Sequence, residues 1–177
     1  MTNRLTPDDW IAAGFRALAE IGPQALKAEA IARQLGTTKG SFYWHFKDID
    51  TYRVQMTTLW AEQAVTVFSE HLSSGETLPI RLRRIAIPVG ASTRLGAMRT
   101  EIAMRGWAQS DHTVANVVMH IDAQRTEIVA GILRQLEVTD PSFATLIYGA
   151  WVGMHMQGQA DVTPPMETLI DLILALR

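Results

Sequence analysis

The sequence predicts an all-α fold, with a three-helix unit in residues 1–47 joined by a long helix to a helical domain in residues 48–177. Apolar residues recur at spacings of three and four, and no convincing segment alternates as a half-buried strand does. Hydrophobic residues make up 47% of the 177 positions, which is enough for a sizeable core. The absence of cysteine excludes disulfides, thiolate zinc sites and cysteine nucleophiles.

The first helix is predicted to begin at Thr6 and to stop at Gly22-Pro23. Thr6 can cap the helix, Pro7 suits its first position, and the two aspartates that follow favour the positive end of the helix dipole. One helix cannot bury its own apolar stripe, so we expect it to pack against the next two helices. The stripe consists of Ile11, Phe15, Leu18 and Ile21.

Two short helices joined by a glycine turn are predicted between Leu26 and Lys47. Gly36 suits the left-handed end of a helix over about 26–35, and Thr37 or Thr38 can cap the second helix. Phe42 and Phe46 lie four residues apart and share its buried face. The opposite face is basic, aromatic and hydroxyl-bearing, which suits the DNA major groove.

The candidate DNA-contacting residues are Lys27, Thr38, Lys39, Ser41, Tyr43, Trp44, His45 and Lys47. Lys39 could reach a guanine edge, and Lys27 and Lys47 could clamp phosphates. Trp44 could stack on a sugar or on the first helix. Glu29 either reads a cytosine amine or lies outside the footprint. The alternative is an ordinary solvated face, but adjacent exposed aromatic rings are unusual on an inert surface. The net charge of −2 does not itself indicate a nucleic-acid binder.

The linking helix is predicted from Asp48, its cap, to about Leu72. Because it has no break, movement in the second domain could tilt the first. Further helices are expected over 78–91, where Pro88 should bend or end the helix, and over 93–108, 111–138, 140–158 and from Thr163 onward.

Large apolar side chains with a few polar groups form a candidate small-molecule pocket: Trp60, Met104, Trp107, Met119, Asp122, Trp151 and His155. An ordinary helical core would have the same composition. The histidines match no metal-binding spacing, and we expect no cofactor, metal or catalytic residue.

The last two predicted helices carry surplus apolar surface, which suggests a partner. The candidate interface residues are Phe143, Ile147, Ala150, Met154, Leu169, Leu172, Ile173 and Leu176. Gly149 and Gly153 would let another helix approach closely. The alternative is that these helices only close the core of the monomer.

The run Tyr43-Trp44-His45-Phe46, after Ile31-Ala32 and Leu35-Gly36, resembles the helix-turn-helix of the TetR-type (TetR/AcrR) transcriptional regulators. The close similarity spans about Thr6 to Lys47, and the segments 105–111 and 122–125 resemble the core region of many members. The resemblance implies phosphate contacts for Tyr43 and His45. The family commonly has lysine at the position of Ile49 and a serine or threonine cap at that of Lys27.

The same resemblance implies a homodimer formed through the last helices and a palindromic double-stranded DNA operator. It also implies a repressor released by an unknown small-molecule effector, for which the aromatic and methionine content suggests a hydrophobic compound. A helical small-molecule-binding protein or enzyme without DNA binding is the alternative, although no nucleophile elbow, phosphate loop or dinucleotide fingerprint is present. No apolar run suits a signal peptide or a membrane span, so we expect a cytoplasmic protein.

Overall fold

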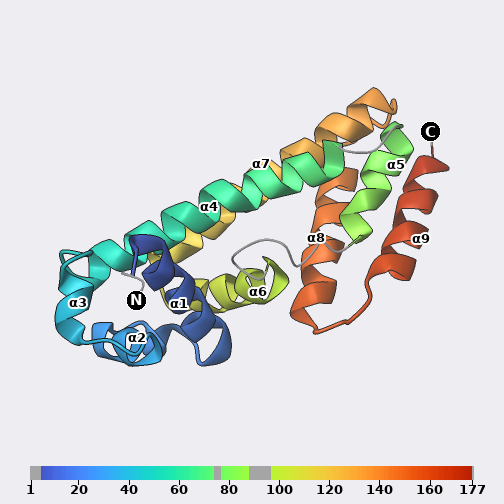
Figure 1. Cartoon of the computed structure of the whole chain (residues 1–177). Coiled ribbons are helices and arrows are strands. Elements are labelled where there is room, and N and C mark those ends of the chain that lie inside the picture. The colour runs from blue at the N-terminus through green and yellow to red at the C-terminus, as the bar shows by residue number, and fades with distance from the viewer. Residues whose placement is uncertain (1–4, 74–76, 88–96, 177) are drawn as a thin grey trace. The chain divides into compact units, whose positions relative to one another are not determined.

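The computed structural model describes residues 5–73, 77–87 and 97–176. Within these ranges the chain forms α-helices and short 3-10 helices and no strand, which confirms the all-α prediction (Figure 1). Backbone contacts group the chain into two compact units: unit 1 is Met1–Glu62 with Ala91–Val118, and unit 2 is Gln63–Gly90 with Met119–Arg177. This grouping differs from the expected functional boundary between residues 47 and 48, which stays a prediction.

Helix α1, Pro7–Glu20, begins unit 1 with the predicted cap. The Asp9 amide donates to Thr6 Oγ1 at 3.3 Å, and the Thr6 amide donates to Asp9 Oδ2 at 2.8 Å. This reciprocal pair satisfies two amides that the first helical turn leaves free. Ile21 is exposed, so the buried stripe of α1 is one residue shorter than predicted. The 3-10 helix η1, Pro23–Ala25, follows Gly22 and was not predicted.

An aromatic cluster forms the core of unit 1. The ring of Phe42 lies 5.5 Å from Trp10, 5.1 Å from Phe46 and 5.3 Å from Tyr52. The Tyr52 hydroxyl donates to the Trp10 carbonyl oxygen at 2.8 Å, and burial raises the pKa of this phenol. The cluster therefore ties α1 to the predicted helix pair and to the start of helix α4, Ile49–Ser73.

Side-chain caps start two of the longest helices. Asp48 Oδ1 accepts from the Thr51 amide at 2.7 Å before α4, as predicted. Asp111 Oδ1 accepts from the Thr113 amide at 2.9 Å before helix α7, His112–Gln135. Glu137 has a positive φ of 66°, and α7 ends earlier than the predicted Val138. Both α4 and α7 run from unit 1 into unit 2.

The segment between these helices differs most from the prediction. Helix α5, Leu78–Arg83, is short and continues as the 3-10 helix η2, Arg84–Ala86. The predicted stop at Pro88 and the predicted start at Thr93 lie outside the described residues. Helix α6 is described as Ala97–Ala108, and its end agrees with the prediction.

Helix α8, Ser142–Met156, and helix α9, Thr163–Leu174, pack together in unit 2. A 2.6 Å ion pair joins Arg83 to Asp171, and the Thr163 hydroxyl donates to the Ala86 carbonyl at 3.2 Å. These contacts link α9 to α5 and η2. Among the described helices, none is long and apolar enough to cross a membrane.

Candidate nucleic-acid interface

The predicted helix pair consists of α2, Ala28–Gln34, and α3, Lys39–Tyr43. Gly36 has a φ of 65° in the turn between them, a backbone conformation that costs glycine little. Thr38, rather than Thr37, caps α3, because its hydroxyl oxygen accepts from the Ser41 amide at 3.3 Å. Lys27 occupies the cap position of α2 and provides no side-chain cap.

The outer face of α3 and the residues after it keep two aromatic rings in solvent. The exposed fraction is 49% for Tyr43 and 86% for Trp44, whereas Phe42 and Phe46 are buried. Trp44 therefore does not pack on α1. His45 is half-buried instead, with its ring 6.1 Å from the ring of Trp10.

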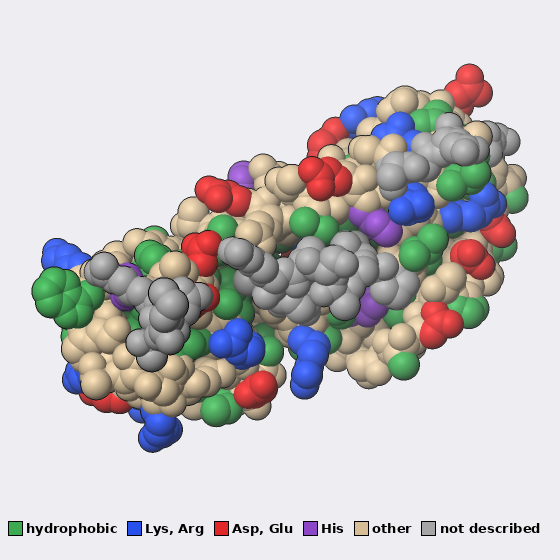
Figure 2. Space-filling view, viewed as in Figure 1, with side chains coloured by type: hydrophobic (Ala, Val, Ile, Leu, Met, Phe, Trp, Pro, Cys, Tyr) green, Lys and Arg blue, Asp and Glu red, His purple; other side chains and the backbone are tan. Residues whose placement is uncertain are grey.

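Exposed lysines lie on and beside the helix pair that carries this aromatic face. Lys27, Lys39 and Lys47 are all exposed, and Ser41 is half-buried. Around the position of α3 in Figure 1, Figure 2 shows apolar and basic side chains together on the surface. The helix pair thus presents the predicted residue types, whose individual DNA contacts stay predictions.

Lys39 has a partner that the sequence did not predict. Its ammonium forms an ion pair with Glu29 of α2, and it lies 5.9 Å from the centre of the Tyr43 ring. The hydrogen bond from Lys39 lowers the pKa of Glu29 and raises that of Lys39 itself. The Glu29 carboxylate, whose two alternative roles the sequence left open, is therefore paired with the first residue of α3.

The candidate pocket residues divide between the two units. Trp60, Met104 and Trp107 are buried in unit 1. In the same unit, α6 carries a buried ion pair in which Arg105 Nη2 lies 2.8 Å from Glu101 Oε1. These unit 1 side chains have the burial expected of an ordinary core.

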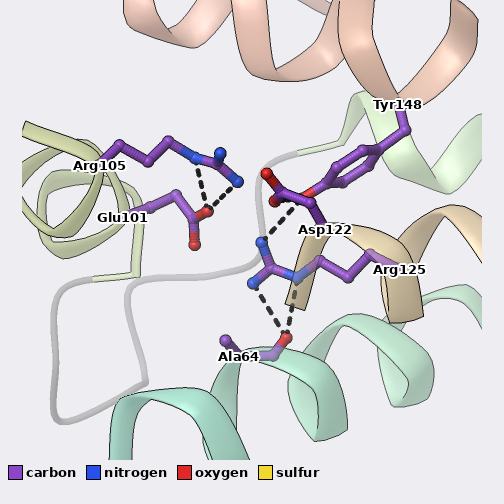
Figure 3. A network of polar contacts seen from close by, with 6 residues as sticks. All are labelled: Ala64, Glu101, Arg105, Asp122, Arg125 and Tyr148. Atoms are coloured by element: carbon purple, nitrogen blue, oxygen red, sulfur yellow. Dashed lines mark hydrogen bonds and ion pairs between the residues drawn. The ribbon is translucent and has the colours of Figure 1, made fainter. Parts of the chain in front are cut away.

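In unit 2, three of the candidate pocket residues, Asp122, Trp151 and His155, join one cluster centred on Arg125. Figure 3 shows Arg125 with Asp122, Tyr148 and Ala64. The Tyr148 hydroxyl donates to Asp122 Oδ1 at 2.7 Å. Trp151 stacks on Tyr148 at 5.7 Å, and His155 meets the Trp151 ring edge-on at 5.1 Å. Met119 has 66% of its surface exposed and is not among the buried residues of the unit.

Arg125 itself was not predicted as a site residue. It is buried, donates from Nη2 to the Ala64 carbonyl at 3.0 Å, and lies 5.3 Å from the Phe68 ring and 5.8 Å from the Trp151 ring. A sequence signal existed, since Arg125 stands four residues from both Ile121 and Val129 on the buried face of α7. A charged residue at such a position requires buried partners.

The candidate interface residues also differ in exposure. Ile147 and Ile173 are buried within unit 2, whereas the exposed fraction is 63% for Leu172 and 69% for Leu176. Phe143, Ala150, Met154 and Leu169 are half-buried. Leu146 and Met156 of α8 are exposed and were not predicted. A Cβ atom on Gly149 or Gly153 would meet no heavy atom within 4 Å, so this stretch of α8 has open space beside it.

Comparisons with known proteins agree with the helix pair. Residues 11–51 match the family model described as bacterial regulatory proteins, tetR family. No curated protein sequence matches the chain. In the described ranges, histidine, aspartate and glutamate form no cluster able to hold a metal ion.

Three solved structures of low sequence identity share the fold. One of them, a TetR-family regulator from Rhodococcus sp., superposes with a TM-score of 0.76 at 18% identity, covering 95% of this chain and 98% of its own. A second regulator, from Rhodococcus sp. Rha1, gives 0.70 at 18% identity over 97% and 95%. The TetR-family regulator PfmR from Thermus thermophilus gives 0.67 at 16% identity over 94% and 97%.

Proposed function

We propose, from the premise that this chain is a DNA-binding transcriptional regulator of the TetR family, that it acts as a homodimeric repressor released by a small molecule. Regulators of this family act by binding and are not enzymes. The observation that carries the DNA-contacting role of α3 is the exposed pair Tyr43 and Trp44, between buried Phe42 and Phe46 in the sequence and next to exposed lysines. Such a regulator works in the cytoplasm, where its operator lies.

The proposed contacts divide by chemistry. Lys39 and Ser41 lie on α3 and contact base edges, whereas Lys27 and Lys47 flank the helix pair and contact phosphates. Tyr43 and His45 donate to the phosphate backbone, and Trp44 stacks against a sugar. The Thr38 hydroxyl oxygen caps α3, which leaves its O–H free to donate to a phosphate.

The proposed dimer pairs α8 and α9 of two copies. Leu172 and Leu176 expose apolar surface on and after α9, and Leu146 and Met156 do so on α8. The interface excludes Ile147 and Ile173, because both are already buried within one chain. A two-fold dimer would present its recognition helices to half-sites about 34–36 Å apart, which requires a palindromic operator.

The proposed effector is a hydrophobic small molecule that acts on unit 2. The support is the cluster of Asp122, Arg125, Tyr148, Trp151 and His155, which combines aromatic surface with polar groups. The effector releases DNA only if it binds one conformation more tightly than the other. The continuous helix α4 supports transmission of such a change to the helix pair. It extends from unit 2 back to Ile49, directly after its cap Asp48.

Selection from a library of randomised DNA duplexes tests the proposed function. We expect the wild-type chain to enrich a palindromic motif and to bind it less tightly as salt rises. Lys39→Ala and Tyr43→Ala should weaken binding to the enriched duplex, because each removes a proposed contact. Failure of the wild type to enrich any motif would contradict sequence-selective binding, and an enriched motif without two-fold symmetry would contradict the proposed dimer.

A further inference from the structure

We propose that Glu29 and Lys39 together read one G·C base pair in each half-site. In this arrangement Glu29 does not merely repel phosphate, and Lys39 does not merely contact phosphate. The inference rests on the proposed binding of α3 in the major groove. It assigns a role to a carboxylate that lies among the cationic residues of the helix pair.

The pair is built from two different helices. Glu29 lies in the first turn of α2, and Lys39 is the first residue of α3. The ion pair and the Tyr43 ring together restrict the Lys39 ammonium, which would otherwise move on a flexible stem. Both side chains are exposed, so DNA can reach them without rearranging the core.

The charges of the pair cancel, and this changes what Lys39 can contribute. A free lysine adds affinity for any DNA sequence, because binding to phosphate releases counterions. A lysine held by a carboxylate loses much of that contribution, because the carboxylate repels phosphate. The Glu29–Lys39 pair therefore favours a part of the DNA that offers hydrogen-bond acceptors to the ammonium and a hydrogen-bond donor to the carboxylate.

The major-groove edge of a G·C pair offers that pattern. An ammonium group has three N–H donors, and in Lys39 one of them bonds to the Glu29 carboxylate. The two that remain match the adjacent N7 and O6 acceptors of guanine, while Glu29 can accept from the N4 amino group of cytosine. On an A·T pair, the second ammonium donor would face the N6 amino donor of adenine. G·C is therefore the matched base pair.

A simpler role for Glu29 is favourable interaction with the positive end of α2. That role predicts an effect on helix stability and none on base preference. An exposed ion pair also adds little to stability, because solvent screens it. The two explanations can thus be separated by measuring sequence preference.

The test compares four proteins in selections from the same randomised duplex library. They are the wild type, Glu29→Met, Lys39→Met and the control Glu20→Met, which removes one exposed carboxylate from α1. We expect the wild-type and control motifs to share one G·C position per half-site. In the Glu29 and Lys39 variants the preference at that position should fall by about tenfold, while the other positions stay unchanged.

The outcomes separate the inference from the proposed function. If the wild type enriches no motif, both are contradicted. If it enriches a motif that either of the Glu29 and Lys39 variants leaves unaltered, only the joint reading of a G·C pair is contradicted. Circular-dichroism melting should give the same Tm for all four proteins, because every substituted side chain is exposed.

A second measurement uses fluorescence anisotropy on a random-sequence duplex over a range of salt concentrations. Release of Lys39 in Glu29→Met should steepen the slope of log K against log salt by about 0.9, the value for one added phosphate contact. The control Glu20→Met should keep the wild-type slope. An unchanged slope in Glu29→Met, or an equal increase in Glu29→Met and Glu20→Met, would overturn the inference.

Discussion

Gly14 allows two parts of unit 1 to pack closely. A Cβ atom at this position would collide with the hydroxyl oxygen of Tyr52, which the bond to the Trp10 carbonyl holds in place. The ring is also packed against Phe42 and Phe46, so it has little freedom to move away.

Gly14→Ala should therefore lower the free energy of unfolding by about 1–3 kcal/mol through overpacking. Thermal or urea unfolding followed by circular dichroism measures the change. The matched control is Gly106→Ala in α6, because a Cβ atom there meets no heavy atom within 4 Å. The control should be neutral or stabilising, since alanine is the better helix former. Equal losses in both variants would contradict the proposed clash.

Trp44 provides a fluorescent probe for the proposed interface. The chain has five tryptophans, and Trp10, Trp60, Trp107 and Trp151 are all buried. We expect iodide to quench one tryptophan efficiently, with emission at longer wavelength, and Trp44→Phe should remove that component. Enriched operator DNA should protect the same component from iodide. Unchanged quenching in the presence of bound DNA would place Trp44 outside the interface.

At the scale of helices, the elements that begin at a side-chain cap were predicted best. The capping residues Thr6, Asp48 and Asp111 provide local signals, because each contacts an amide only two or three residues away. The extents of α5 and α7 were predicted less well. Apolar spacing alone did not reveal the change to a 3-10 helix at Arg84 or the left-handed residue Glu137.

The cap of α4 should make stability depend on pH. The hydrogen bond from the Thr51 amide lowers the pKa of Asp48 below its ordinary value of 3.8. The folded chain then binds this proton less readily than the unfolded chain, so the contribution is present above about pH 4 and is lost as the pH falls through the lowered folded pKa.

Asp48→Asn keeps a capping oxygen and removes the titration. We expect its urea-unfolding free energy to fall less than that of the wild type between pH 6 and pH 3, while other carboxylates titrate in both proteins. Equal losses over that interval would show that Asp48 does not contribute. Asp8→Asn is the control, because it removes a carboxylate from the start of another helix in unit 1.

At the scale of the whole molecule, periodicity identified buried faces but could not tell which buried residues meet. Trp60, Trp107 and Trp151 are the same residue type and were grouped in one candidate pocket. Trp60 and Trp107 nevertheless belong to unit 1, and Trp151 belongs to unit 2. The centre of the unit 2 cluster, Arg125, acts through contacts with residues 61 and 23 positions away. Likewise, the pairing of Glu29 with Lys39 depends on how the turn at Gly36 brings α2 and α3 together.

The proposed dimer gives a prediction for the assembled protein. Leu172 and Leu176 are exposed in one chain, so replacing both by glutamate should leave the folded monomer intact. Two buried carboxylates in a two-fold interface would be doubled by symmetry and costly to desolvate. We therefore expect light scattering after size exclusion to change from the dimeric to the monomeric mass.

Affinity of the double variant for a palindromic operator should fall at least tenfold, because two linked half-sites become independent. The control Ile80→Glu, at an exposed position of α5, should remain dimeric. A double variant that stays dimeric with native circular dichroism would remove these two leucines from the interface.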